Sequence, residues 1–480
     1  MRCKYCGTLQ DEPAGAKICV QCGGELGAEL IPYEDEPTRV SGSYVRAQLE
    51  LDQIAAPAGQ IVERHLVVTV ETPAAVPPGE QARTQAGREP LSFVAVLDVS
   101  GSMQGDKIRA AKEAVRQAVN RLQDGDLFAL VTFATDVQCP LSSWRIDTNL
   151  RQAVEGLLQA IRAGGQTALC GGLEEGIRQA STHRGDEIHR GANLVLLLSD
   201  GQANVGETDV EAVGQRAIDA RTRGITVSTL GVGSDYNEAL MAEVAIDGGG
   251  RFYHIADAER IAAYLAGELG EMASLAARNA AVDLHLPAGA GVQPLSAAYP
   301  VRGQTEGHTV TLGDIPTATT LEVVVRVLLP PQPAGSRLPI DGILRYQSPA
   351  GNALATPLNK VTVRYDQADL FAYAAGAVRP VVRRVLGQMQ AAGVLSTAKA
   401  AARSEDDAHR QSAVALSAMR QYASLLGEDE KAREALSESE AILHEIADLQ
   451  NAASPAQSQR TKAATHAAMR IQRGSKDFDT

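Results

Sequence analysis

The stretch VLDVSGSM, residues 96–103, places one carboxylate and two hydroxyls directly after an apolar run. Asp98 ends the run, and Ser100 and Ser102 follow at alternate positions. An extended turn points alternate side chains to the same side, so both hydroxyls can face one ligand. The spacing predicts a group of converging oxygen atoms at the end of a buried strand.

Two more oxygen-bearing side chains occur further along the chain. Asp200 ends a second apolar run, NLVLLLSD, and Thr167 lies in the loop GGQTALCGG. If the two apolar runs are neighbouring parallel strands, both carboxylates reach the carboxyl edge of one sheet, where ligands bind. Two carboxylates and three hydroxyls, without imidazole or thiolate, are ligands that Mg²⁺ prefers; Mn²⁺ and Ca²⁺ are alternatives.

Each of these residues also has a simpler explanation when it is taken alone. Asp98, Ser100 or Ser102 could cap the helix that follows. Asp200 with Gly201 could form a turn. Their joint occurrence at the ends of two apolar runs favours the metal site.

Strand-like and helix-like patterns alternate from residue 91 to residue 275. Apolar runs with no polar face require helices on both faces of their sheet. The pattern predicts a doubly wound, mostly parallel α/β sheet. The expected strands are 91–98, 127–133, 137–141, 193–200, 225–233 and 251–255, and the expected helices are 106–123, 149–161, 171–181, 208–222, 237–246 and 257–272.

DVSGS, Thr167 in GGQTAL, and LLLSDGQAN resemble the metal-ion-dependent adhesion site of von Willebrand factor type A domains. The resemblance covers about 180 residues. It implies that Ser100, Ser102 and Thr167 contact the cation and that Asp98 and Asp200 act mainly through water. It also implies an open coordination position for an Asp or Glu of a partner protein.

Four cysteines at the start of the chain form two C-x2-C pairs with twelve residues between them. Thiolates at this spacing suit tetrahedral Zn²⁺ with no open position, and two disulfides or free thiols are the alternative. The segment 1–26 resembles a zinc ribbon, and an acidic linker is expected at 27–42. The expected zinc ligands are Cys3, Cys6, Cys19 and Cys22.

Short alternating strands flank the central domain on both sides. Residues 43–90 and 276–366 are predicted to build one antiparallel β-sandwich into which the α/β domain, 91–275, is inserted. This arrangement resembles the β-domain of inter-alpha-trypsin-inhibitor-like chains. Residues 367–453 are expected to form a helical hairpin. The basic tail 454–480 is expected to be disordered, with a short helix at 461–472 as the alternative for part of it.

The chain has 480 residues and a net charge of −13, so binding to nucleic acid or to an anionic membrane is not expected. It has no run long enough to span a membrane and no secretory signal, which favours a cytoplasmic protein. The excess of Arg over Lys and the abundance of Ala indicate a bacterium with a GC-rich genome. The sequence indicates a non-catalytic, metal-dependent protein-binding module, a scaffold or regulator. The alternatives are a Mg²⁺-dependent hydrolase or phosphotransferase, and a purely structural subunit.

Overall fold

The computed structural model of the protein describes residues 43–81, 90–182, 192–200, 203–232, 237–255, 269–270, 274–296, 298–304, 307–367, 376–401, 403–448 and part of 460–471. The expected zinc ribbon and acidic linker lie outside the described residues. The chain divides into two compact units. One consists mainly of residues 77–275, and the other joins the segments on either side of it.

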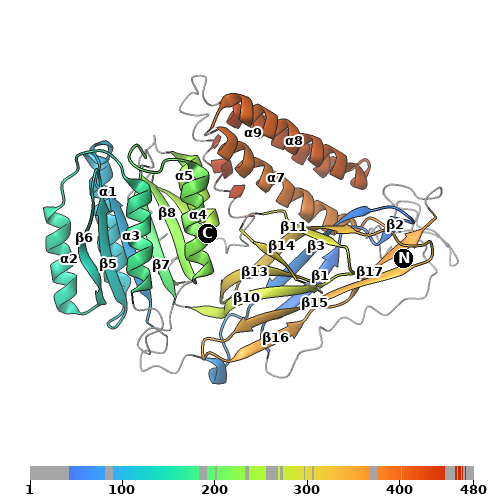
Figure 1. Ribbon diagram of the computed structural model, residues 1–480, viewed down its shortest axis with the longest axis horizontal. Coiled ribbons are helices and arrows are strands. Elements are labelled where there is room, and N and C mark those ends of the chain that lie inside the picture. Colours follow the sequence, from blue (N-terminus) through green and yellow to red (C-terminus); the bar gives the residue numbers. More distant parts are fainter. Residues whose placement is uncertain are drawn as a thin grey trace. The chain divides into compact units, whose positions relative to one another are not determined.

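The first unit is an α/β domain with a six-stranded sheet in the order β6-β5-β4-β7-β8-β9 (Figure 1). All neighbouring strands are parallel except β5 and β6. The expected doubly wound, mostly parallel sheet is therefore confirmed. The strands are β4 (Ser92–Asp98), β5 (Leu127–Phe133), β6 (Val137–Arg145), β7 (Asn193–Ser199), β8 (Ile225–Val232) and β9 (Gly249–Ile255).

Helices cover both faces of this sheet. On β4, Phe93, Ala95 and Leu97 join a buried cluster with the apolar residues of α1 and α2. The alternate residue Val96 faces α3 on the opposite side. Thr229 of β8 donates a hydrogen bond to the Met241 carbonyl of α5. The helices are α1 (Asp106–Arg121), α2 (Thr148–Ala160), α3 (Leu169–Ser181), α4 (Val210–Thr222) and α5 (Glu238–Asp247).

Glycines allow α3 to pack close to the sheet. A Cβ atom at Gly176 would overlap the side chain of Val96, and one at Gly172 would overlap the ring of Phe133. Both neighbours are fully buried, so they have little freedom to move away. The two glycines thus fix the position of α3 and of the loop that leads into it.

The second unit contains two further sheets. A four-stranded sheet has the order β1-β3-β14-β11, and a larger sheet has the path β12-β13-β10-β15-β17-β2, with β16 pairing with β15. Strands from before and after the α/β domain pair directly, β3 with β14 and β2 with β17. The stacking of the two sheets as a β-sandwich stays a prediction.

The alternating pattern predicts strands at 44–51, 61–71, 281–287, 308–312, 319–329, 341–347 and 360–366, and the structure confirms a strand in each of these regions. The pattern missed four short strands, β2, β11, β12 and β16. The strands before the α/β domain are β1 (Arg46–Leu51), β2 (Ala55–Pro57) and β3 (Val62–Glu71). Those after it are β10 (Leu275–His285), β11 (Gly291–Pro294), β12 (Val301–Gln304), β13 (Gly307–Pro316), β14 (Thr320–Leu329), β15 (Arg337–Gln347), β16 (Ala353–Pro357) and β17 (Val361–Asp366).

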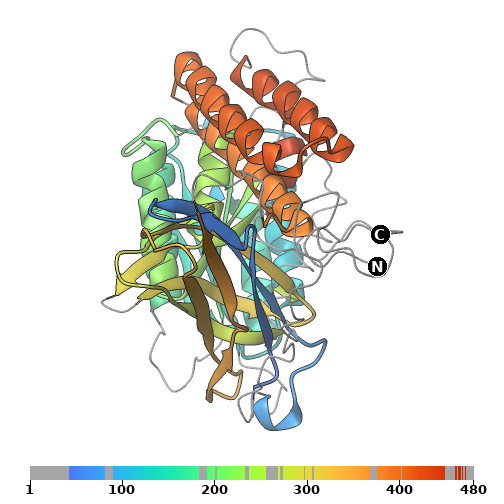
Figure 2. The ribbon, with the colours of Figure 1, turned by 90° about the vertical axis from the view of Figure 1, so that its right-hand side faces the viewer.

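Three long helices, not the expected two, follow the sheets: α7 (Arg379–Ala401), α8 (Glu405–Ala423) and α9 (Glu430–Ala447) (Figures 1 and 2). The hairpin prediction was wrong because α7 packs against both other helices. α7 also joins the buried cluster that contains Val67 of β3 and Val324 of β14. Within the described part of the chain, no helix combines the length and the apolar character that a membrane span requires.

For the residues of 460–471 that the structure describes, the alternative prediction of a short helix at 461–472 is confirmed and the prediction of disorder was wrong. These residues are helical. Ala468 joins the buried cluster of α7, α8 and α9, and Gln388 of α7 donates a hydrogen bond to the carbonyl of Ile471. Burial of small side chains such as Thr461 and Thr465 orders a segment that has few large apolar residues.

Buried polar contacts hold the helices in place. The carboxylate of Asp429 caps α9 and accepts hydrogen bonds from Arg383 at 2.5 Å and Arg379 at 2.8 Å. On α8, the Tyr422 hydroxyl donates to Asp52, and the same carboxylate oxygen lies 3.0 Å from the Nδ1 atom of His65 on β3. These contacts link the helices to one another and to the sheet.

The glycine packing of α3 can be tested with Gly176→Ala. Alanine is the better helix former, by about 1 kcal/mol. Nevertheless, overlap with Val96 should lower the free energy of unfolding by roughly 1–3 kcal/mol. The matched control is Gly156→Ala in α2, where a Cβ atom would meet no neighbour within 4 Å. Urea unfolding should show loss of stability for the first variant and no loss for the second.

Asp429 should make the second unit sensitive to acid. Hydrogen bonds from Arg383, from the Ala432 backbone and from Arg379 lower the pKa of Asp429 from 3.8 to about 2. Because the pKa is lower in the folded state, the stabilisation is complete above about pH 4 and is lost as the pH falls toward 2. It amounts to about 2 kcal/mol.

Asp429→Asn keeps a capping side chain but should remove this pH dependence between pH 4 and 2, as measured by thermal unfolding. Asp147→Asn is the control. Asp147 caps α2 without an arginine partner among the described residues. An unchanged pH profile in Asp429→Asn would contradict the assignment.

Candidate functional site

The candidate site lies where the strand order of the α/β sheet reverses. β4 pairs with β5 on one side and with β7 on the other, and both neighbours are parallel to it. Asp98 is the last residue of β4, and Asp200 directly follows β7. Their carboxylates therefore belong to adjacent strand ends at the carboxyl edge, as expected for a ligand-binding position in this type of sheet.

Asp98 is completely buried and accepts hydrogen bonds on both carboxylate oxygens. The backbone N–H of Ser100 donates to Oδ1 at 2.8 Å, and the hydroxyl of Ser199 donates to Oδ2 at 2.5 Å. These bonds fix the carboxylate and the turn that follows it. The turn is a short 3-10 helix, Gly101–Met103, and the fully buried Met103 anchors it in the core.

The two serine hydroxyls lie side by side in this turn, with their Oγ atoms 3.0 Å apart. Ser100 is buried, whereas Ser102 is exposed. The pair therefore extends from the buried Asp98 to the surface, and Ser102 is the member that an external ligand can reach.

Asp200 is completely buried and forms an ion pair with Lys107 of α1, with 3.2 Å between Nζ and Oδ2. Burial raises the pKa of Asp98 above its ordinary value, and the negative charge of Asp200 raises it further. The hydrogen bonds from Ser100 and Ser199 act in the opposite direction. The two carboxylates thus interact electrostatically, and the burial of Asp98 makes its charged form costly when no positive charge lies close by.

The loop that contains Thr167 lies beside the serine turn. The N–H of Gly101 donates to the carbonyl of Gly165 at 2.9 Å, and the N–H of Gly164 donates to the carbonyl of Val99 at 2.8 Å. Thr167 itself is buried, and its N–H donates to the Asn204 side chain at 2.7 Å. Asn204 lies beyond Asp200, so this contact connects the loops that follow β7 and precede α3.

The structure thus brings the loops of the five predicted site residues together at one edge of the sheet. It adds three side chains that sequence reasoning missed: Lys107, Ser199 and Asn204. Ser199 and Asn204 lie within the LLLSDGQAN segment, so the segment was found but their contacts were not. Nothing in the sequence marks Lys107, because its partner is 93 positions away.

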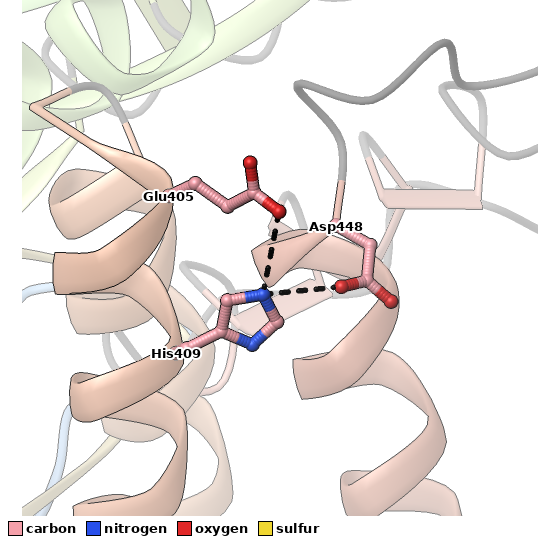
Figure 3. Close-up of side chains that lie close together, drawn as sticks. All are labelled: Glu405, His409 and Asp448. Atoms are coloured by element: carbon pink, nitrogen blue, oxygen red, sulfur yellow. Dashed lines mark ion pairs between the residues drawn. The ribbon is translucent and has the colours of Figure 1, made fainter.

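A second group of potential metal ligands lies on α8 and α9 (Figure 3). Figure 3 shows the carboxylates of Glu405 and Asp448 turned toward one ring nitrogen of His409, at 3.7 and 3.2 Å. The three side chains are between 36% and 63% exposed. Ion pairing at the surface accounts for this group, which shares no residue with the site at the sheet edge.

Each of the following relatives is similar to this chain over only a part of both sequences. The uncharacterized protein YfbK of Escherichia coli is 31% identical over 190 residues, which are 39% of this chain and 32% of YfbK. An uncharacterized protein of Synechocystis is 26% identical over 284 residues, 56% of this chain and 66% of that protein. Inter-alpha-trypsin inhibitor heavy chain H1 of Sus scrofa is 32% identical over 208 residues, 42% of this chain and 22% of the heavy chain.

Solved structures share the fold of nearly the whole chain. A von Willebrand factor type A protein from Catenulispora acidiphila has a TM-score of 0.62 and 20% identity, covering 91% of this chain and 99% of that one. The ArnB paralog VWA2 from Sulfolobus acidocaldarius has a TM-score of 0.56 and 16% identity, covering 90% of this chain and 100% of that one.

The family model of the von Willebrand factor type A domain matches residues 93–266, which contain the sheet-edge site. Domains of this family commonly mediate protein–protein interactions. With the six-stranded sheet and its helices, this match identifies the α/β unit of the chain as a von Willebrand factor type A domain.

Proposed function

We propose that the chain is a non-catalytic binding protein whose type A domain recognises a partner protein through a divalent cation. The cation, Mg²⁺ with Mn²⁺ or Ca²⁺ as alternatives, is held at the edge of β4 and β7. The proposed ligand set is Asp98, Ser100, Ser102, Thr167 and Asp200.

The observation that carries this proposal is the burial of two carboxylates at adjacent strand ends. Asp98 and Asp200 are both 0% exposed. Burying ionised groups is costly unless opposite charge lies close by. The ammonium of Lys107 offsets one negative charge, and a divalent cation would offset the other. Because the remaining candidates are hydroxyls, the set of oxygen donors fits a hard cation.

The chain's own residues would perform distinct roles. By the resemblance to adhesion sites, Ser100, Ser102 and Thr167 contact the cation and the two aspartates hold it mainly through water. A bound cation would supply a positive centre. Because Ser102 is exposed, an Asp or Glu of a partner would reach this centre from the surface.

The chemistry of the site favours binding over catalysis. Its described side chains are carboxylates, hydroxyls, one lysine and one amide. Among these described side chains there is no histidine that could act as a base for a hydroxyl. A Mg²⁺-dependent hydrolase or phosphotransferase stays the alternative, together with a structural subunit whose cation stabilises loops.

The zinc ribbon belongs to the same proposal. Cys3, Cys6, Cys19 and Cys22 would hold Zn²⁺ in a closed tetrahedral site that provides the folding energy of this small segment. The ribbon and the helices α7–α9 would offer further contacts for partners. We place this scaffold or regulator in the bacterial cytoplasm.

Removal of the cation should lower the stability of the type A domain. In the chelated full-length protein, added Mg²⁺ at about 100 times its dissociation constant should raise the free energy of unfolding by about 2.7 kcal/mol. Thermal unfolding and isothermal titration calorimetry measure this effect.

Asp98→Ala should abolish the response. Asp124→Ala serves as the control, because Asp124 is 76% exposed and precedes β5 at the opposite edge of the sheet. A response of equal size in Asp98→Ala and in the unchanged protein would place the cation elsewhere.

Partner binding should depend on the same cation. Protein captured from native cells on the immobilised full chain should be retained in Mg²⁺ and released by EDTA. The Asp98→Ala chain should not retain it. Retention by all three preparations would refute recognition through the cation, and turnover of phosphate esters that Asp200→Ala abolishes would favour the enzyme.

A further inference from the structure

Lys107 supplies a fixed positive charge inside the candidate metal site. Its ammonium lies 3.2 Å from a carboxylate oxygen of Asp200, and its side chain is only 19% exposed. Lys107 is the second residue of α1, and the turn before that helix is made by Gly105 at φ 79°, a conformation that favours glycine. The local backbone thus directs the start of α1 toward the site.

We propose that Lys107 makes the cation-bound site select carboxylates over neutral oxygen ligands. In this proposal Lys107 weakens binding of the divalent cation and, in exchange, gives the occupied site the positive charge that attracts a carboxylate. The inference rests on the proposed function. The inference extends the proposed function, because it assigns the charge selectivity of the site to a residue outside the set of oxygen ligands.

The formal charges of the described side chains show how Lys107 could do this. Two carboxylates, Asp98 and Asp200, and the ammonium of Lys107 add up to minus one. A bound divalent cation changes this to plus one, so an acidic partner group meets net attraction. Without Lys107 the empty site would have minus two, and the occupied site would be neutral. A neutral site would discriminate less between a carboxylate and a neutral oxygen ligand.

The burial of Asp200 and Lys107 strengthens the electrostatic effect of these charges. Asp200 is fully buried and Lys107 largely so, which reduces screening by water. An exposed lysine at the same distance from Asp200 would contribute little. The ion pair also gives Asp200 a partner when no cation is bound, so the strand end is not left with an unpaired charge.

Replacement of Lys107 distinguishes a role in charge selection from a role in supporting the fold. Lys107→Met should bind Mg²⁺ about tenfold more tightly and a carboxylate about tenfold more weakly. A lysine that only supports the fold would give weaker binding of both. Lys107→Arg keeps the charge and should stay close to the unchanged protein in both measurements.

The experiment uses the full-length chain and two titrations. Isothermal titration calorimetry with Mg²⁺ measures the first affinity. The second titration adds acetate to the Mn²⁺-loaded protein, and water-proton relaxation reports displacement of water from the cation. Propionamide, a neutral ligand of similar size, measures the discrimination. Arg109→Met is the matched control, because Arg109 is an exposed cation on the same helix.

Lys107→Met could lose stability in the absence of metal, because Asp200 would then be buried without this partner. Purification in excess Mg²⁺ supplies a replacement positive charge. Lys107→Gln provides a second variant that keeps a hydrogen-bond donor and removes the charge. The same two opposite shifts are expected for it.

Three outcomes distinguish the role of Lys107 from the proposed cation binding itself. Opposite shifts in Lys107→Met or Lys107→Gln, absent in Arg109→Met and Lys107→Arg, support the inference. Cation binding that Asp98→Ala abolishes, together with parallel shifts or no shift in the Lys107 variants, overturns the inference and leaves the proposed function intact. No Mg²⁺ binding by the unchanged protein, or equal binding by Asp98→Ala, overturns both.

Discussion

The burial of two like charges at neighbouring strand ends is the constraint around which the α/β domain is arranged. Asp98 and Asp200 are held apart from water where β4 and β7 finish. Each charge is stabilised by groups from other elements: the Ser100 backbone and the Ser199 hydroxyl for Asp98, and Lys107 for Asp200. A sheet edge that only closed a core would not require such compensation.

The rest of the domain positions these groups. Close packing at Gly172 and Gly176 sets the depth of α3, and hydrogen bonds from Gly101 and Gly164 connect its leading loop to the serine turn. Loops that would be mobile in isolation are thereby held on a rigid sheet. Such fixed geometry suits recognition through a cation, since the ligands need not be ordered when the partner arrives.

The second unit shows a comparable use of buried polar contacts between distant segments. β3 and β14, which lie on either side of the α/β domain in sequence, pair over their full length. Asp52 and His65 meet Tyr422 of α8, and Asp429 meets two arginines of α7. Satisfied buried polar groups of this kind specify one packing arrangement, because any other would leave a charge or a hydroxyl unpaired.

The α/β class of the central domain, the two strand-end aspartates and the segments of the candidate site can all be predicted from the amino-acid sequence. Local signals suffice for these features: apolar runs define buried strands, and Asp98 and Asp200 directly follow such runs. The folded chain was needed to show that β4 and β7 are neighbours, that α7 adds a third helix, and that Lys107 pairs with Asp200. These depend on contacts between distant positions, and local periodicity carries no information about which distant residue completes a pair.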